Sequence, residues 1–201
     1  MEKMKAKKSD RAKVVRIMCN ALTQVPGTSW IAGSGRNRES RLFALAEYMF
    51  DVSAEKDGVY LSSGSDGVLL MFNSSARANR LKMLYYRLKL ICNCIGFLRL
   101  PAVLRREQYI RAVRPIQRQY LYVWFFAVEE GKRGKGAAVE LANTCFAESA
   151  RLGLPVYAET TISRNKKVYE RFGFDTYHTW AMNSLSFVTW FLKLSPVSKM
   201  Q

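Results

Sequence analysis

The first 25 residues carry an apolar pattern with helical spacing. Apolar side chains recur every three or four positions over residues 14–22, directly after the potential N-caps Ser9 and Asp10 and before Pro26. The pattern predicts one helix here. The lysine-rich residues 1–8 show no periodicity, and we expect them to form a frayed tail.

The next 50 residues combine a second helix with a hairpin. Residues 39–50 repeat apolar positions at helical spacing after a turn-rich stretch at 27–35. Two short apolar runs, 59–61 and 68–72, flank a turn made of Ser, Gly and Asp. That arrangement is typical of a β-hairpin.

Residues 76–118 are predicted to be helical and strongly basic. Apolar positions between 81 and 95 fall on one face, while Gly96 and Pro101 divide the region and Pro115 ends it. The region holds 11 Lys or Arg residues and a single carboxylate, Glu107.

The last 80 residues alternate strands and helices. An apolar run at 120–128 reads as a strand buried on both faces, and after a turn a helix extends to Gly153. The remaining elements are a strand at 156–159, a short helix from about Arg164 to Gly173, and strands at 175–182 and 186–194. Without a repeat or linker, this order predicts one α/β domain over residues 1–201, with a mixed sheet.

Composition narrows the class of protein. With 49% hydrophobic and 12% aromatic residues the chain has material for a core, and no apolar run reaches the ~20 residues of a membrane span. Since no clean signal peptide is present either, we expect a cytoplasmic protein. Four unpaired cysteines and one histidine, His178, argue against a metal site, a disulfide framework or Ser-His-Asp catalysis, so carboxylates and tyrosines must carry any acid/base chemistry.

Charge is concentrated in the first 118 residues, which hold 22 basic and 9 acidic side chains against 10 and 7 in the rest. For the basic region 76–118, a solvated helical face is the default interpretation. Contact with nucleic acid or with anionic lipid is a less favoured alternative, because no recognition helix or RNA motif accompanies the charge.

The turn between the strand at 120–128 and the following helix has the chemistry of a diphosphate site. The first N–H groups of a helix lack partners and its dipole is positive there, so an anion can be held by main chain alone. Gly134, Gly136 and the small Ala138 leave room for close approach, and Lys132, Arg133 and Lys135 add positive charge. The spacing fits neither G-x-G-x-x-G nor a P-loop.

Two linked motifs resemble the GNAT superfamily of N-acetyltransferases. Its acetyl-CoA motif R/Q-x-x-G-x-G/A is matched from Arg133 to Ala138, and its N-x-x-x-Y-E-R-x-G-F helix is matched from Asn165 to Phe174. The resemblance covers residues 119–180 in the right order. It implies a mixed, mostly antiparallel sheet flanked by helices, with the fourth and fifth strands splayed and the basic region as a helical insert before the fourth.

The resemblance also implies where acetyl-CoA would bind. The pantetheine arm would lie along the main chain near Ala127 and Val128, where the Val128 N–H would stabilise the oxyanion. The basic insert would then be placed to cap the acceptor cleft. The residues expected to bind the cosubstrate are Ala127, Val128, Arg133, Gly134, Lys135, Gly136, Ala137, Ala138 and Asn165.

The expected catalytic residues are Tyr169 and Glu159. By resemblance Tyr169 is the general acid for the departing thiolate, and its pKa of ~10 suits a hydrogen-bonding donor. Glu159, at the end of the fifth strand, is the first choice of general base, and Glu129 and Glu130 are alternatives through a water relay. His178 is expected to be structural or to lie at the surface.

The sequence therefore predicts an acetyl-CoA-dependent N-acetyltransferase that acts on an unidentified amine by direct attack in a ternary complex. A homodimer is compatible with this interpretation. The rival from another class is a non-catalytic protein that binds CoA, a nucleotide or nucleic acid on the same fold.

Overall fold

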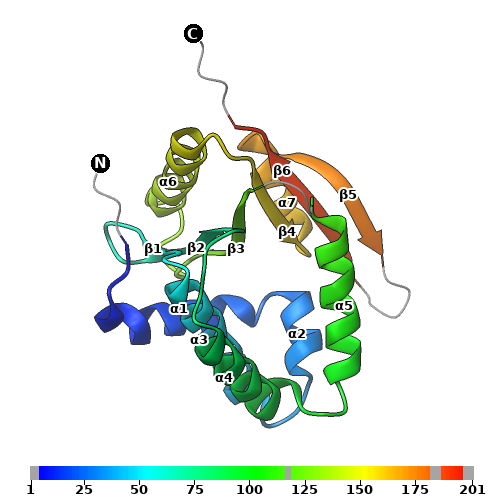
Figure 1. Ribbon diagram of the computed structural model, residues 1–201. Helices are drawn as coiled ribbons and strands as arrows, with labels where there is room; N and C mark the ends of the chain where they lie inside the picture. Colours follow the sequence, from blue (N-terminus) through cyan, green and yellow to red (C-terminus); the bar gives the residue numbers. More distant parts are fainter. Residues whose placement is uncertain (1–4, 116–118, 182–186, 197–201) are drawn as a thin grey trace.

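The computed structural model describes residues 5–115, 119–181 and 187–196 (Figure 1). Outside these ranges lie Arg118, where the predicted basic region ends, and residues 1–4 of the tail. Met182 and Ser186, predicted as the end of one strand and the start of the next, lie outside them too. The strands are β1 Val59–Leu61, β2 Gly67–Asn73, β3 Leu121–Val128, β4 Val156–Thr160, β5 Asp175–Ala181 and β6 Val188–Leu194. The α-helices are α1 Arg11–Leu22, α2 Pro26–Ala32, α3 Arg38–Glu55, α4 Arg80–Leu90, α5 Leu100–Val113, α6 Ala137–Leu152 and α7 Ser163–Arg171.

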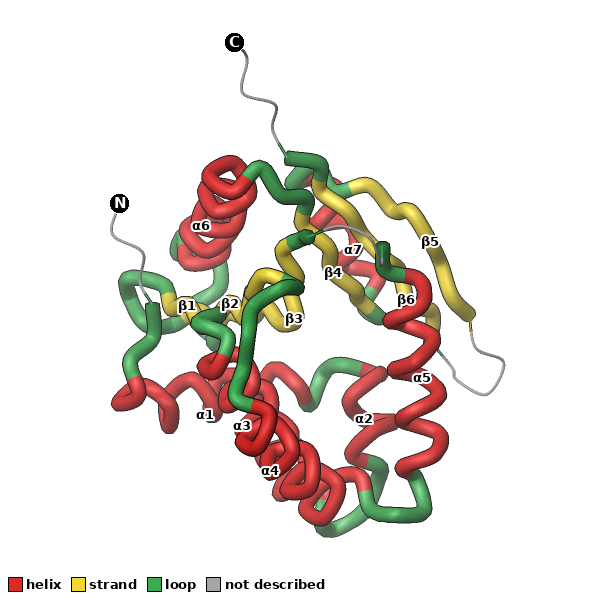
Figure 2. Tube along the Cα trace, viewed as in Figure 1, coloured by secondary structure: helices red, strands yellow, loops and turns green. Residues whose placement is uncertain are grey.

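The strands form one mixed sheet in the order β1-β2-β3-β4-β6-β5. Every neighbouring pair is antiparallel except β3 and β4, which run parallel. The strands coloured yellow in Figure 2 cross the molecule between two groups of helices. The prediction of a mostly antiparallel sheet flanked by helices is confirmed.

Apolar side chains form a core on each face of the sheet. On one face α1 and α3 pack on Val59, Leu61 and Leu70, and on the other α6 packs on strand residues such as Leu69 and Val123. Figure 1 shows α6 on one side of β1–β3 and α1, α3 and α4 on the other. Alternation along β2 explains this division, since successive strand residues point to opposite faces.

The strands β3 and β4 separate soon after they meet. They pair only from Leu121 to Val123 on β3, although β3 continues to Val128. A bulge marks the point of departure: β2 pairs with Val123 and Phe125 but skips Trp124. Trp124 and Phe125 consequently both pack on the α3 face, because a bulge adds one residue and turns the strand. The splay that the resemblance implied is present.

Two local predictions for the first 35 residues are wrong. Pro26 begins α2 instead of leaving residues 27–35 as a turn, since proline is well suited to the first helical position. Residues 5–7 are not frayed either: Lys5 bridges to Tyr60 and forms an ion pair with Asp57, and the Ala6 N–H donates to the Val59 carbonyl at 3.1 Å.

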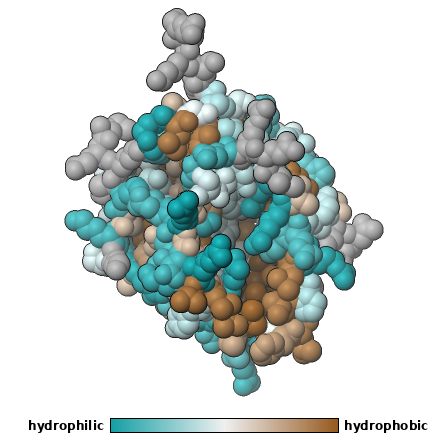
Figure 3. Space-filling view, viewed as in Figure 1, coloured by the Kyte–Doolittle hydropathy of each residue, from teal (hydrophilic) through white to brown (hydrophobic). Residues whose placement is uncertain are grey.

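The predicted apolar face of the insert is not buried as a whole. Leu81, Leu84, Tyr85 and Leu88 of α4 are 53–79% exposed. Cys92 is exposed as well, whereas Cys94 is buried. Figure 3 shows hydrophobic side chains gathered at the lower part of this face of the molecule. No helix among the described residues is apolar over the length that a bilayer requires.

Gly67 sets how closely α6 approaches the sheet. A Cβ on Gly67 would lie 2.9 Å from Leu141 Cδ1 and 3.4 Å from the Cβ of Ala137, the first residue of α6. The absence of a side chain on β2 therefore allows the N-terminus of α6 to lie against the strand.

We predict that Gly67→Ala lowers the free energy of unfolding by about 1–3 kcal/mol, because the added methyl group overpacks the contact with Leu141. Urea denaturation of the two proteins measures the difference. Gly27→Ala is the matched control, since its Cβ would meet no atom closer than 3.5 Å. Equal losses for the two variants would contradict this account of Gly67.

Candidate active site

The loop between β3 and α6 is open and rich in glycine. Gly131, Gly134 and Gly136 have φ values of 82°, 81° and 92°, and nothing lies within 4 Å of a Cβ built on any of them. Only glycine adopts this left-handed backbone readily. Within the described part of the chain, the N–H groups of residues 133–136 donate no hydrogen bond to the protein. These donors and the first turn of α6 form a cradle for an anion.

Three basic side chains of the exposed loop surround this cradle. Lys132 and Lys135 form no ion pair with a described carboxylate, and Arg133 contacts only Gln24 Oε1, at 3.5 Å. The positive end of the α6 dipole lies at the same place. The local field therefore favours a polyanion such as a diphosphate.

The turn between β1 and β2 supports both ends of the loop. The Asp66 carbonyl accepts from the Glu129 N–H at 2.7 Å, at the start of the loop. At its end, the Glu140 carboxylate accepts from the Ser63 N–H at 2.9 Å and from the Ser63 hydroxyl at 2.9 Å. The carboxylate in the first turn of α6 is thus engaged, and the helix N-terminus keeps its attraction for an external anion.

Backbone donors on β3 point into the gap beside β4. Gly67 directs both its N–H and its carbonyl to Ser62 on the β1 side, and it stands opposite Val128. In an antiparallel ladder such a pair makes no mutual hydrogen bonds. The N–H groups of Val128 and, two residues earlier, Phe126 therefore face the gap, as the oxyanion role expected of Val128 requires.

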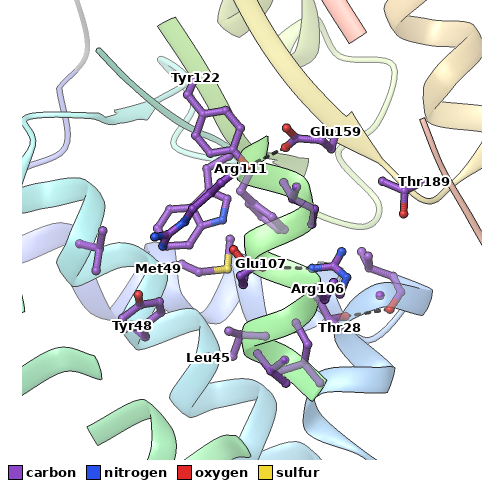
Figure 4. A pocket seen from close by; sticks show the side chains of 18 of the residues that line it. Thr28, Leu45, Tyr48, Met49, Arg106, Glu107, Arg111, Tyr122, Glu159 and Thr189 are labelled. Atoms are coloured by element: carbon purple, nitrogen blue, oxygen red, sulfur yellow. Dashed lines mark hydrogen bonds and ion pairs between the residues drawn. The ribbon is translucent and has the colours of Figure 1, made fainter. Parts of the chain in front are cut away.

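A cavity of about 770 Å³ lies next to the gap. Its walls come from α2, α3, α4, α5, β3, β4 and the start of α7. Figure 4 shows α5 beside α3, with labelled side chains of the two helices, such as Glu107 and Met49, pointing toward each other. The basic insert thus covers one side of the cavity, as a cap would.

The cavity reaches residues on both faces of the sheet. Tyr122 and Trp124 lie on the α3 face, where Phe72 packs edge-on against both rings. Tyr169, by contrast, packs against the core on the α6 face, and its ring meets Phe174 at 5.1 Å. All but Phe174 line the same cavity, so the gap between β3 and β4 connects the two sides.

Glu159 lies in the cavity wall and is held by two partners. Arg114 donates to it through Nε at 2.7 Å and through Nη2 at 3.0 Å, and the Tyr122 hydroxyl donates to Oε2 at 2.7 Å. Figure 4 shows Glu159 directed from β4 toward Tyr122. The guanidinium of Arg114 also stacks 3.8 Å from the Tyr122 ring centroid.

These contacts determine the protonation states of Arg114 and Tyr122. Burial, reinforced by the Glu159 charge, raises the pKa of Tyr122 well above its usual value. Burial alone would lower the pKa of Arg114, but Tyr122 and Glu159 outweigh it and the pKa rises. Arg114 therefore remains a cation and Tyr122 a neutral donor at physiological pH.

Tyr169 lines the cavity and carries a protonated hydroxyl. Burial raises its pKa above the usual value, and the nearby Cys145 and Glu159 act in the same direction. Among the described residues its hydroxyl has no hydrogen-bond partner. It is therefore available to donate to a bound ligand.

The other candidate residues lie at separate places in the structure. Asn165, one helical turn before Tyr169, also lines the cavity, and Ala127 lies on the splayed part of β3. Glu129 and Glu130 are not in the cavity wall; Glu129 lies 3.8 Å from Arg16. His178 is structural as expected, with Nε2 3.0 Å from the Tyr109 hydroxyl.

Sequence reasoning missed the polar groups that the insert contributes. Arg106 pairs with Glu107 at 3.1 Å, while its Nε and the Thr161 hydroxyl are buried without a described partner. Arg106 and Thr161 both line the cavity. Arg114 lines it as well and donates to Glu159. The only sequence signal was the lone carboxylate Glu107 in a basic region, which does not show which arginines turn inward.

The strand gap, the glycine loop and the adjoining cavity lie next to one another around β3. Residues 77–174 match the acetyltransferase (GNAT) family. The chain therefore carries a GNAT acetyltransferase domain, and acetyl-CoA is the cosubstrate that this family implies. Among curated proteins, no sequence matches the chain.

Solved structures share the fold over nearly the whole chain. A Corynebacterium glutamicum protein described as "histone acetyltransferase HPA2 and related acetyltransferase" has a TM-score of 0.66 at 17% identity, with 100% of both chains covered. Arylalkylamine N-acetyltransferase 2 from Aedes aegypti has a TM-score of 0.63 at 13% identity, covering 98% of this chain and 99% of the other. A Drosophila melanogaster polyamine N-acetyltransferase has 0.62 at 12%, covering 96% and 98%. At these identities the likeness shows the fold alone.

Proposed function

We propose that this protein transfers the acetyl group of acetyl-CoA to an amine by direct attack in a ternary complex. The observation that carries the proposal is the gap between β3 and β4, which joins the anion cradle at α6 to the large cavity. Two ligands bound in these two places would meet at the gap, and holding reactants together removes much of the entropic barrier.

The cosubstrate would enter along β3. Its diphosphate would be bound by the N–H groups of residues 133–138 and by the loop cations. Its pantetheine arm would then hydrogen-bond to the free backbone of Phe126 and Val128, in the way that an added strand does. The Val128 N–H would lie where the thioester oxygen gains negative charge during attack.

Tyr169 would protonate the departing thiolate. Its side chain lines the cavity, its hydroxyl has no hydrogen-bond partner among the described residues, and its raised pKa keeps the proton in place until a thiolate forms. Because a thiol has a pKa of ~8.5, below that of the tyrosine, full proton transfer to the thiolate is uphill, and a hydrogen bond to the developing anion is the main contribution.

Glu159 would serve the incoming amine. Of the three carboxylates that the sequence suggested, it alone lines the cavity. Because Arg114 and Tyr122 occupy both of its oxygens, it would act through a remaining lone pair or a bridging water. Its charge would also attract the ammonium form of the acceptor.

We predict that Gly136→Glu weakens CoA binding by about 100-fold, because the carboxylate repels the diphosphate and blocks the N–H cradle. Isothermal titration calorimetry with CoA measures the effect. Gly153→Glu is the matched control: it places the same residue at the other end of α6, also at positive φ and in open space. Equal CoA affinity in the two variants would place the diphosphate elsewhere.

We predict that Tyr169→Phe lowers kcat by about 100-fold or more while CoA affinity changes little, since only the acid is lost. Release of free thiol from acetyl-CoA with a panel of amines measures turnover. The raised pKa of Tyr169 further predicts that wild-type kcat does not decline as pH rises toward about 10. Unchanged turnover in the variant would remove Tyr169 from the acid role.

We predict that Glu159→Gln lowers kcat/KM by about 100-fold near neutral pH and that the loss shrinks at higher pH, where the amine is already neutral. A pH profile separates this from a structural defect, which high pH would not repair. Glu107→Gln is the control, since Glu107 is the other carboxylate in the cavity wall. A larger loss in that control would transfer the base role to Glu107.

A further inference from the structure

The cavity that adjoins the gap is lined by more cations than anions. Its basic residues come from α4, α5 and the segments next to α3 and α5, and among the described residues its only carboxylates are Glu107 and Glu159. Each carboxylate already has an arginine partner, Arg106 at 3.1 Å and Arg114 at 2.7 Å. The basic residues of the lining are Lys56, Arg87, Arg106, Arg111 and Arg114.

Three of these cations remain without a carboxylate, and we call them the basic cluster: Lys56, Arg87 and Arg111. None forms an ion pair with a described residue. Lys56 is half-buried at the end of α3, with Nζ 4.1 Å from the Phe72 ring centroid. Figure 4 shows Arg111 extending from α5 toward α3.

The members of the basic cluster repel one another. Burial lowers the pKa of Lys56, and the charges of Arg111 and Arg87 lower it further. The same two arginines act on the hydroxyl of Tyr48, whose side chain lines the cavity nearby. Cations that repel one another in this way are stabilised when an anion binds between them.

The cosubstrate does not supply that anion. In the proposed arrangement its phosphates lie at residues 133–138, none of which lines the cavity. Only the pantetheine arm and the thioester would reach the gap, and neither carries a charge. The second substrate is therefore the ligand that can neutralise the basic cluster.

We propose that the acceptor is an amine that also bears an anionic group, a carboxylate or a phosphate, and that this group binds to Lys56, Arg87 and Arg111. The proposal rests on the proposed function and adds the class of acceptor. In this arrangement the amine lies toward Glu159 and the gap, and the anion lies toward the end of α3.

The wall between these two ends is aromatic and selects for the body of the molecule. Tyr48, Phe72, Tyr122 and Trp124 line it, and Tyr48 meets Trp124 edge-on at 5.9 Å. An aromatic or extended aliphatic spacer fits such a surface. A diamine fits poorly, because its second ammonium would face the basic cluster.

The test compares amines that differ only in the anion. Tyrosine is paired with tyramine, tryptophan with tryptamine, and ω-amino acids of two to six carbons with alkylamines of equal length; phosphoethanolamine paired with ethanolamine separates phosphate from carboxylate. We expect kcat/KM to be about tenfold to a hundredfold higher for at least one anionic member than for its neutral-tailed partner. A uniform preference for the amines without the anion overturns the proposal.

Variants of single arginines on α5 test where the anionic group of the acceptor binds. Arg111→Gln should raise KM for the preferred anionic acceptor about tenfold to a hundredfold and change kcat/KM for its uncharged partner far less. Arg105→Gln removes the same charge from the same helix at an exposed position outside the cavity and should change neither. Equal effects of the two variants, or equal effects on both acceptors, overturn the assignment.

Calorimetry of the same compounds with the CoA-bound protein requires no turnover. If an anionic amine binds the wild type tightly and Arg111→Gln weakly, but no amine is acetylated, the anion site stands and the proposed transferase function fails. If amines are acetylated without any preference for the anion in binding or rate, the transferase function stands and the anion site fails.

Discussion

The early end of the pairing between β3 and β4 is the constraint on which the rest of the structure depends. Parallel strands normally satisfy each other's backbone hydrogen-bonding groups, and here the pairing stops at Val123. The bulge at Trp124 turns β3 away, and the N–H groups of Phe126 and Val128 are left facing a gap. A sheet with unpaired donors in its middle is explained when a ligand completes the ladder.

The elements around the gap form the rest of the candidate site. The hairpin turn at Asp66 and Ser63 fixes the glycine loop, and the absent side chain of Gly67 brings α6 close enough for its N-terminus to serve the same ligand. On the opposite face the insert encloses the second space. Of its arginines in the cavity wall, Arg106 and Arg114 are bound to Glu107 and Glu159, while Arg87 and Arg111 form no ion pair with a described residue.

The second half of the chain predicted its own strands and helices well, because apolar runs and the glycines that end helices are local signals. Other features depend on tertiary contacts that no local pattern reveals. The helix that begins at Pro26 was missed since Gly27 and Ser29 weaken the helical signal. The exposure of Leu84 and Leu88 was missed because α4 packs against α3 along a different face from the apolar one. The partnership of Arg114 with Glu159, 45 residues apart, has no sequence signature.

Amide hydrogen exchange with and without CoA tests the central claim most directly. The account predicts that CoA slows exchange at Phe126, Val128 and residues 133–137. The amides of α4, which belongs to the insert, should keep their rates. Protection confined to α4 and α5, or no change along β3 and the glycine loop, would contradict the placement of the cosubstrate in the gap.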